Sequence, residues 1–91
     1  MKLSVVVPVY NGVLTLRDLC SRLEAVSRRL DAQHEIILVD DRSPDTSWDL
    51  IQDLAKKNPS IRGFRLSRNF GQHTALTCGL DQISGDWAVV M

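Results

Sequence analysis

The chain has 91 residues, of which 44% are hydrophobic and 24% are charged, and this composition excludes a disordered tail and a fibrous repeat. Lysine and arginine together number 11, as do aspartate and glutamate, so the charge gives no reason to expect a partner such as nucleic acid or an anionic membrane surface. A chain of this length allows one small domain, spanning residues 1–91, or a piece of a domain.

The first two predicted elements are a buried strand and an amphipathic helix. Residues 3–9 are rich in β-branched valine and run into the turn residues Tyr10, Asn11 and Gly12, as is typical of a strand and its end. From about residue 13 to residue 30, apolar residues recur at helical spacing and arginines occupy the other face. The apolar positions are Leu16, Leu19, Cys20, Leu23, Val26 or Ser27, and Leu30.

A second strand and a second helix follow. Residues 35–39 are predicted to form a second buried strand, which ends abruptly at the polar run 40–45. In that run Ser43 or Asp45 can cap a helix, and Pro44 suits its first turn. The apolar stripe of the helix is Trp48, Ile51, Leu54 and Ala55.

The remaining elements are a strand, a helix and the start of a fourth strand. Residues 58–60 end the second helix, and residues 61–66 form a more weakly patterned strand. A third helix is predicted from about Phe70 to the stop signal Ser84-Gly85, and residues 86–91 begin a fourth strand. The inner face of the third helix is expected to carry Leu76, Leu80 and Ile83.

The order βαβαβαβ predicts an α/β domain. Strands that alternate with helices of crossover length indicate a parallel sheet with right-handed connections and helices on both faces. In such a sheet, ligands bind outside the carboxyl ends of the strands, near the point where the strand order reverses. Three short segments follow those ends: residues 8–12, 40–43 and 67–71.

The segment after the first strand carries an aromatic residue. It lacks the pattern Gly-x-Gly-x-x-Gly, which argues against an NAD-type dehydrogenase. Tyr10 either stacks on a nucleobase or is an ordinary, partly buried aromatic residue at a strand end.

Two adjacent carboxylates, Asp40 and Asp41, follow the second strand. Because side chains alternate, only one of them lies toward the crevice, and the other caps the turn. A carboxylate there can accept hydrogen bonds from a base imide or from ribose hydroxyls, or both can simply close the turn. A metal site like that of receiver domains is a third reading. The order argues against it, since receivers carry the acidic pair after the first strand and an aspartate after the third, where this chain has Ser67 and Arg68.

The segment after the third strand offers groups for an anion. Arg68 either contacts a phosphate or is solvated, as alternating arginines on a strand usually are. Gly71 allows close backbone approach at the start of the third helix, where free N–H groups suit anions. His34 and His73 have no partner at a useful spacing and are expected on the surface or in packing roles.

Neither the cysteines nor the N-terminus indicates export. Cys20 and Cys78 belong to no Cys-x-x-Cys or Cys/His cluster, so we expect two reduced, buried residues and no disulfide or zinc site. The apolar run before Pro8 is followed by no cleavage site, and no segment approaches the roughly 20 apolar residues that span a bilayer. We expect a cytoplasmic protein.

Three motifs, in order on three strand ends, resemble those of family 2 glycosyltransferases of the GT-A fold. They are residues 5–11, 37–45 and 66–71. The resemblance covers the whole chain, and the third motif is most similar to the polyprenyl-phosphate sugar transferases. Gln72-His73 departs from the Lys-Glu of many such relatives.

The resemblance implies that the chain is the Rossmann-like, nucleotide-binding half of a GT-A domain. The domain would transfer a sugar from a UDP- or GDP-linked donor to an acceptor, with polyprenyl phosphate as one such acceptor at the inner face of the cytoplasmic membrane. Pro8 and Tyr10 would flank the base, Asp41 would hydrogen-bond it, and Asp40 would support the turn. Arg68 and Gly71 complete the expected substrate-binding set.

The family also implies Mg²⁺ or Mn²⁺, held by an Asp-x-Asp motif that would follow Met91. We therefore expect that residues 1–91 supply no metal ligand and no catalytic base, and that alone they do not catalyse transfer. The far edge of the fourth strand would be unpaired, which predicts self-association. The alternatives are a non-catalytic nucleotide-binding or interaction module and a receiver-like signalling domain.

Overall fold

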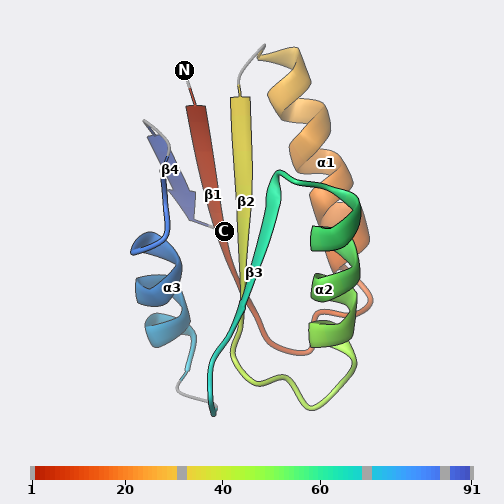
Figure 1. The fold of residues 1–91 in the computed structure, drawn as a ribbon, viewed down its shortest axis with the longest axis vertical. Helices are drawn as coiled ribbons and strands as arrows, with labels where there is room; N and C mark the ends of the chain where they lie inside the picture. Colours follow the sequence, from red (N-terminus) through yellow and green to blue (C-terminus); the bar gives the residue numbers. More distant parts are fainter. Residues whose placement is uncertain (1, 31–32, 69–70, 85–86, 91) are drawn as a thin grey trace.

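The computed structural model describes residues 2–30, 33–68, 71–84 and 87–90, which form one parallel sheet with three helices (Figure 1). The strands are β1 at Lys2–Val9, β2 at Gln33–Asp40, β3 at Ile61–Arg65 and β4 at Trp87–Val90. The helices are α1 at Leu16–Arg29, α2 at Ser47–Lys57 and α3 at Gln72–Leu80. The order βαβαβαβ and the α/β class that the sequence predicts are confirmed.

The strand order is β3-β2-β1-β4, and the helices lie on both faces of the sheet (Figure 1). The chain moves from β1 through β2 to β3 and then crosses to the far side of β1 for β4. Because connections between parallel strands keep one hand, the reversal of direction places α3 on the face opposite α1 and α2. The strand order therefore reverses between β1 and β4, and the carboxyl ends near β1 are where a ligand site is expected.

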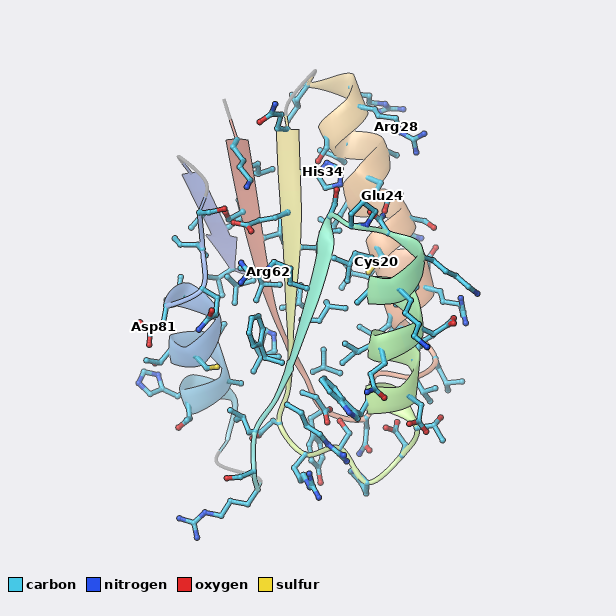
Figure 2. The ribbon with its side chains drawn as sticks, viewed as in Figure 1. Cys20, Glu24, Arg28, His34, Arg62 and Asp81 are labelled. Carbon is cyan, nitrogen blue, oxygen red and sulfur yellow. The ribbon has the colours of Figure 1, made fainter. Side chains whose placement is uncertain are left out.

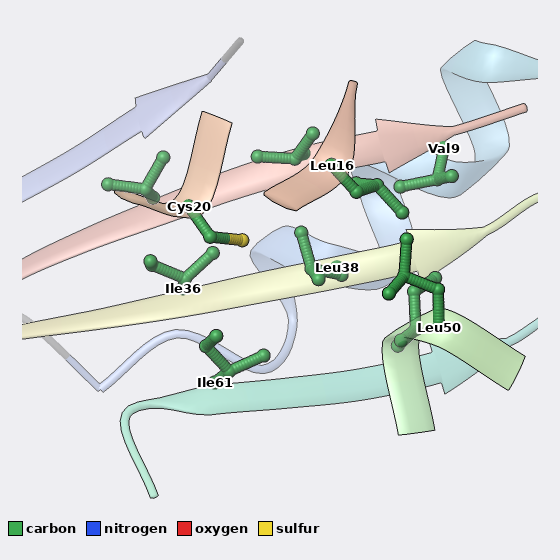
Figure 3. Close-up of a cluster of buried hydrophobic side chains, with 10 residues drawn as sticks. Val9, Leu16, Cys20, Ile36, Leu38, Leu50 and Ile61 are labelled. Carbon is green, nitrogen blue, oxygen red and sulfur yellow. The ribbon is translucent and has the colours of Figure 1, made fainter. Parts of the chain in front are cut away.

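The larger core lies between the sheet and the pair α1 and α2 (Figure 3). Side chains alternate along each strand, so every second residue of β1 and β2 points to this face. Cys20 is buried there and free, as predicted, whereas Cys78 is free but only half-buried. Burial raises the pKa of the Cys20 thiol, and the nearby Glu24 raises it further. The buried members are Val5, Val7, Val9, Leu16, Cys20, Ile36, Leu38, Leu50, Ile51 and Ile61.

Helix α3 packs on the other face through small residues. Of the predicted inner face, Leu80 is wrong, Leu76 is half-buried, and Ile83 does pack on this face. Ala75 is fully buried, and an added Cβ at Gly79 would lie 2.3 Å from Cγ1 of Val6. Leu80 is exposed at the end of the helix, and Ile83 packs from the segment that follows. The helix lies too close to the valine side chains of β1 for a large residue at the contact, so the leucine at its end points outward.

Helix α2 begins later than the predicted caps suggest. The helix starts at Ser47, and Pro44 lies outside it. Oδ1 of Asp45 accepts hydrogen bonds from the Ser47 amide at 2.9 Å and from the Ser47 hydroxyl at 2.5 Å, so Asp45 does satisfy a first-turn N–H group. The Ser47 hydroxyl is also the main cause that holds the pKa of Asp45 below its ordinary value. Ser43 caps no helix and turns toward the strand ends.

Some predicted boundaries lie outside the described residues: the helix start at Phe70, the stop signal at Gly85, and the strand ends at Asp86 and Met91. Among the described strands β4 is an outer strand, and its Ala88, Val89 and Val90 are exposed. The expected self-association through this edge stays a prediction, which light scattering on the purified chain would check. None of the helices in the described part of the chain is long and apolar enough to cross a bilayer.

Candidate functional site

The carboxyl ends of three strands are aligned at one edge of the sheet, at the lower end of Figure 1. In the strand register Val9 of β1 pairs with Asp40 of β2, which pairs with Arg65 of β3. The segments after β1, β2 and β3, which the sequence singles out, therefore start side by side. We call this region the carboxyl edge.

Asp40 is buried at the centre of the carboxyl edge. Its side chain is 0% exposed, and Oδ1 accepts a hydrogen bond from the Ser43 hydroxyl at 2.5 Å. The Ser43 amide lies 3.3 Å from each carboxylate oxygen, and Nε of Arg65 lies 3.4 Å from Oδ2. The Arg65 guanidinium lies in turn over the ring of Trp48, 5.8 Å from its centroid. Asp40 thus closes the turn after β2 and balances a charge at the end of β3.

Two serine hydroxyls join the segment after β1 to the segment after β2 by hydrogen bonds. Oγ of Ser43 accepts a hydrogen bond from the Asn11 amide at 3.1 Å, and Oγ of Ser47 accepts one from the Gly12 amide at 2.9 Å. Sequence reasoning missed these roles because it treated Ser43 only as a helix cap. The available signal was a hydroxyl residue three positions after an aspartate at a strand end, where side chain to backbone bonds are common.

Asp41 joins the end of β2 to the start of α3. Asp41 is only 4% exposed. Its amide donates a hydrogen bond to the carbonyl of Val9 at 2.9 Å, and its Oδ2 accepts one from the Gly71 amide at 3.0 Å. Two of the predicted site residues, Asp41 and Gly71, are therefore in direct contact. The carboxylate is held in a fixed position beside the first turn of a helix.

Backbone strain is concentrated at the carboxyl edge. The positive φ angles of the described residues are 55° at Asn11, 58° at Arg42 and 96° at Gly71, one in each of the three segments. Only Gly71 lacks the Cβ that makes such angles costly. Strained backbone persists where the surrounding structure enforces it, and it is concentrated at functional sites.

The other predicted site residues lie around these anchors. Tyr10 follows β1 and is 51% exposed, so the protein does not bury its ring. Pro8 is half-buried in β1, in register with Val39. Arg68 is exposed in the segment after β3, and the next two residues of that motif, 69–70, lie outside the described residues.

A second buried carboxylate lies toward the opposite end of the strands and belongs to a different cluster. Glu35, early in β2, accepts hydrogen bonds from the Ser4 hydroxyl at 2.6 Å and from the amide and hydroxyl of Ser84 at 2.6 and 3.0 Å. A guanidinium nitrogen of Arg62, labelled in Figure 2, is 3.4 Å away. Burial alone would raise the pKa of Glu35, but the bonds from Ser4 and Ser84 outweigh it and lower the pKa to about 2. This cluster ties the segment before β4 to the sheet.

The histidines take no part in the carboxyl edge. His34 lies near the start of β2, at the other end of the sheet, and its buried Nε2 has no hydrogen-bond partner in the described part of the chain. His73 is exposed in the first turn of α3. The surface or packing roles that the sequence predicts match these positions.

Metal ligands are not grouped at the carboxyl edge. Within residues 2–30, 33–68, 71–84 and 87–90, no three His, Cys, Asp or Glu side chains are placed to hold a metal ion. Asp40 and Asp41 have protein donors on their carboxylates instead. The described residues therefore do not form a site that fits a divalent cation.

Comparison with known proteins identifies sequence relatives along the whole chain. The family model for glycosyl transferase family 2 matches residues 4–91. The undecaprenyl-phosphate 4-deoxy-4-formamido-L-arabinose transferase of Serratia proteamaculans is 42% identical over 91 residues, which are 99% of this chain and 28% of the relative. The enzyme of the same name from Pseudomonas syringae pv. syringae is 42% identical over 97% of this chain and 26% of its own length. The chain thus spans little more than a quarter of these relatives.

Solved structures share the fold. TarS 1-349 of S. aureus, in complex with UDP-GlcNAc, matches with a TM-score of 0.80 and 24% identity over 100% of this chain and 26% of that protein. The mannosyltransferase PcManGT of Pyrobaculum calidifontis, in complex with GDP-Man and Mn²⁺, matches with a TM-score of 0.79 and 21% identity over 92% of this chain and 25% of its own. The four parallel strands in the order β3-β2-β1-β4, alternating with helices, match GT-A structures.

Proposed function

The chain belongs to glycosyl transferase family 2, and on that basis we propose that its carboxyl edge binds the nucleotide of an activated sugar. The sugar is transferred to an acceptor, with polyprenyl phosphate as the acceptor class. The names of the relatives support this class, since the undecaprenyl-phosphate transferases are 42% identical to the chain.

The position of Asp41 is the observation that carries the proposal. This carboxylate lies at the end of β2, next to β1. Strand β1 has β2 on one side and β4 on the other, so the strand order reverses there. The Gly71 amide at 3.0 Å holds one of its oxygens, so its direction is set before any ligand arrives. A carboxylate fixed in this way can accept a hydrogen bond from the N–H of a uracil or guanine ring without further ordering.

The remaining residues of the carboxyl edge have complementary roles. The exposed ring of Tyr10, with Pro8 beside it, flanks the base, because an aromatic face stacks well on a planar base. Asp40 supports the turn that carries Asp41. Arg68 and the backbone at Gly71 complete the binding surface next to the first turn of α3.

The full reaction needs groups beyond those of the carboxyl edge. We infer that transfer needs Mg²⁺ or Mn²⁺ to neutralise the diphosphate, which the Mn²⁺ bound to PcManGT supports, and the described residues form no such site. We place the metal ligands, the acceptor-binding residues and the catalytic base outside residues 1–91, and the reaction at the inner face of the cytoplasmic membrane. On this proposal the 91 residues bind nucleotide and do not catalyse transfer alone.

The test is a calorimetric titration of the chain and its Asp41→Asn variant with UDP and GDP. Asparagine keeps an oxygen for the Gly71 amide but removes the charge that a base N–H prefers. We expect affinity for the preferred nucleotide to fall about tenfold, which is ~1.4 kcal/mol.

The matched control is Asp49→Asn, which removes an exposed carboxylate from α2 and should bind as the parent chain does. Equal affinity of the Asp41→Asn variant and the parent for both nucleotides would contradict the role of Asp41. Absence of binding of either nucleotide to the parent would contradict the proposed function itself.

A further inference from the structure

Resting on the proposed function, we propose that Arg42 binds the phosphate groups of the donor nucleotide. Arg42 occupies the position between Asp41 and Ser43 at the carboxyl edge. Arg42 lies within the motif at residues 37–45, which assigns it no role. Three of its features point to an anion: its backbone conformation, the absence of a partner for its side chain among the described residues, and its neighbours.

The backbone at Arg42 is held on both sides. Asp41 is bonded through its amide to the carbonyl of Val9 and through Oδ2 to the Gly71 amide. Ser43 is bonded to Asp40 at 2.5 Å and receives the Asn11 amide at 3.1 Å. Both neighbours are 4% exposed, whereas Arg42 itself is exposed. The turn therefore presents the Arg42 side chain to solvent from a rigid base.

The conformation of Arg42 is costly for a residue with a side chain. Its φ of 58° lies in the left-handed region, where glycine fits without strain and arginine does not. Packing cannot repay this cost, because the side chain is exposed. A strained position that carries a long cation instead of glycine is better explained by a ligand contact than by folding.

The charge of Arg42 is not used within the part of the chain that the structure describes. Its guanidinium forms no hydrogen bond or ion pair with the described residues, whereas Arg65 pairs with Asp40 and Arg62 pairs with Glu35. A guanidinium offers five N–H donors in a planar fork that matches two phosphate oxygens. An exposed, unpaired fork beside a proposed nucleotide site is suited to an anion.

The neighbouring loop places this cation next to the base. Tyr10 precedes Asn11, and Arg42 precedes Ser43, and the hydrogen bond from the Asn11 amide to Oγ of Ser43 joins the two loops. Arg42 directly follows Asp41, so a nucleotide whose base contacts Tyr10 and Asp41 also lies next to Arg42. Since the phosphates carry the charge of the ligand, they are the partner that the guanidinium prefers over the neutral base.

The experiment compares Arg42→Gln and Arg42→Gly with the parent chain, using NMR titrations with uridine, UDP, guanosine and GDP. We expect about a tenfold loss of affinity for the preferred diphosphate and less than a twofold change for the matching nucleoside. Salt should weaken diphosphate binding less in the variants than in the parent. The charge-matched control is Arg28→Gln, on the exposed surface of α1, which should leave both affinities unchanged.

Folding and binding are separated by the Arg42→Gly variant. Glycine accepts the positive φ, so its melting temperature should not fall below that of the parent while diphosphate affinity does. Equal losses for nucleoside and diphosphate would show stacking on the base and overturn the phosphate assignment, as would unchanged diphosphate affinity. A parent chain that binds no nucleotide would overturn both this inference and the proposed function.

Discussion

Replacement of Glu35 by alanine is expected to lower the free energy of unfolding by about 3 kcal/mol. The carboxylate is 4% exposed and accepts bonds from the Ser4 hydroxyl and from the amide and hydroxyl of Ser84. Alanine leaves the buried Ser4 hydroxyl without its acceptor, and it also removes the acceptor of the Ser84 amide and hydroxyl and the partner of the Arg62 guanidinium. The segment before β4 then loses its bonds to Glu35 of β2 and keeps those from Lys2 of β1 and Arg62 of β3.

The same residue makes stability depend on acid pH. The pKa of Glu35 is lowered from 4.5 to about 2 in the folded chain, because the hydrogen bonds from Ser4 and Ser84 outweigh the effect of burial. A group whose folded pKa is depressed stabilises the protein above its unfolded pKa. The stabilisation, ~3 kcal/mol, is therefore complete above pH ~4.5 and is lost as the pH falls toward 2.

Urea unfolding at pH values from about 2 to about 7, which include the folded and unfolded pKa values of Glu35, measures both effects. The Glu35→Gln variant should lose the part of the acid dependence below pH ~4.5 that Glu35 contributes, while Asp45 and Asp53, whose pKa values are also lowered, keep theirs. Asp81→Asn, which changes an exposed carboxylate at the end of α3, serves as the control and should keep the parent profile. Parallel profiles for the parent and Glu35→Gln would show that the Glu35 cluster does not stabilise the fold as described.

Replacement of Asp40 by alanine is expected to cost about 2–4 kcal/mol of stability and also to weaken nucleotide binding. Asp40 is fully buried, receives the amide and hydroxyl of Ser43, and lies 3.4 Å from Nε of Arg65. Alanine leaves the Ser43 amide without a side-chain acceptor and removes the charge opposite Arg65. Because Ser43 also receives the Asn11 amide, one of the two serine contacts between the loops of the proposed nucleotide site is weakened, while the contact from the Gly12 amide to Ser47 remains.

Urea unfolding and nucleotide titration of the same samples test this prediction. Asp40→Asn keeps an oxygen for Ser43 and should retain more stability than the alanine variant. Asp53→Ala is the control: Asp53 is also paired with two cations, Arg17 and Lys57, but on the exposed surface, so its removal should change far less. A loss of stability at Asp40 no larger than that at Asp53 would contradict the description of Asp40 as a buried anchor.

The sheet and its order of elements were predictable because strong local signals mark them. Valines at alternate positions of β1 point into the main core, and the polar residues at 40–41 mark the end of β2. The inner face of α3 was not predictable in this way. A search for large apolar residues at helical spacing selects Leu76 and Leu80. The contact between α3 and the sheet is instead made by Ala75 and Gly79. Their small size is an advantage only because the helix lies close to the side chains of the sheet, and the helix sequence alone does not show that.

The candidate site, too, was predictable from the sequence only in part. Strand ends in a parallel sheet locate the segments around Tyr10, Asp41 and Gly71, and the structure brings these segments to one edge. The bonds that hold them together, such as the one between Ser43 and Asn11, join residues far apart in the sequence. Local pattern cannot reveal such pairs. It predicts the turn after β2 but not the left-handed backbone of Arg42, since arginine is not a residue that favours a positive φ angle.

The most direct test of the account is to map where a nucleotide sugar binds, using ¹H–¹⁵N NMR spectra of the chain during titration with UDP- and GDP-sugars. If the nucleotide binds at the carboxyl edge, one of these ligands shifts the amide signals of this edge together, while the signals around Glu35 and Ser84 stay in place. The signals expected to shift are those of Tyr10, Asn11, Asp41, Arg42 and Gly71. Shifts confined to the Glu35 end of the sheet or to the outer surface of α2, or no shifts with either ligand, would contradict a nucleotide site at the carboxyl edge.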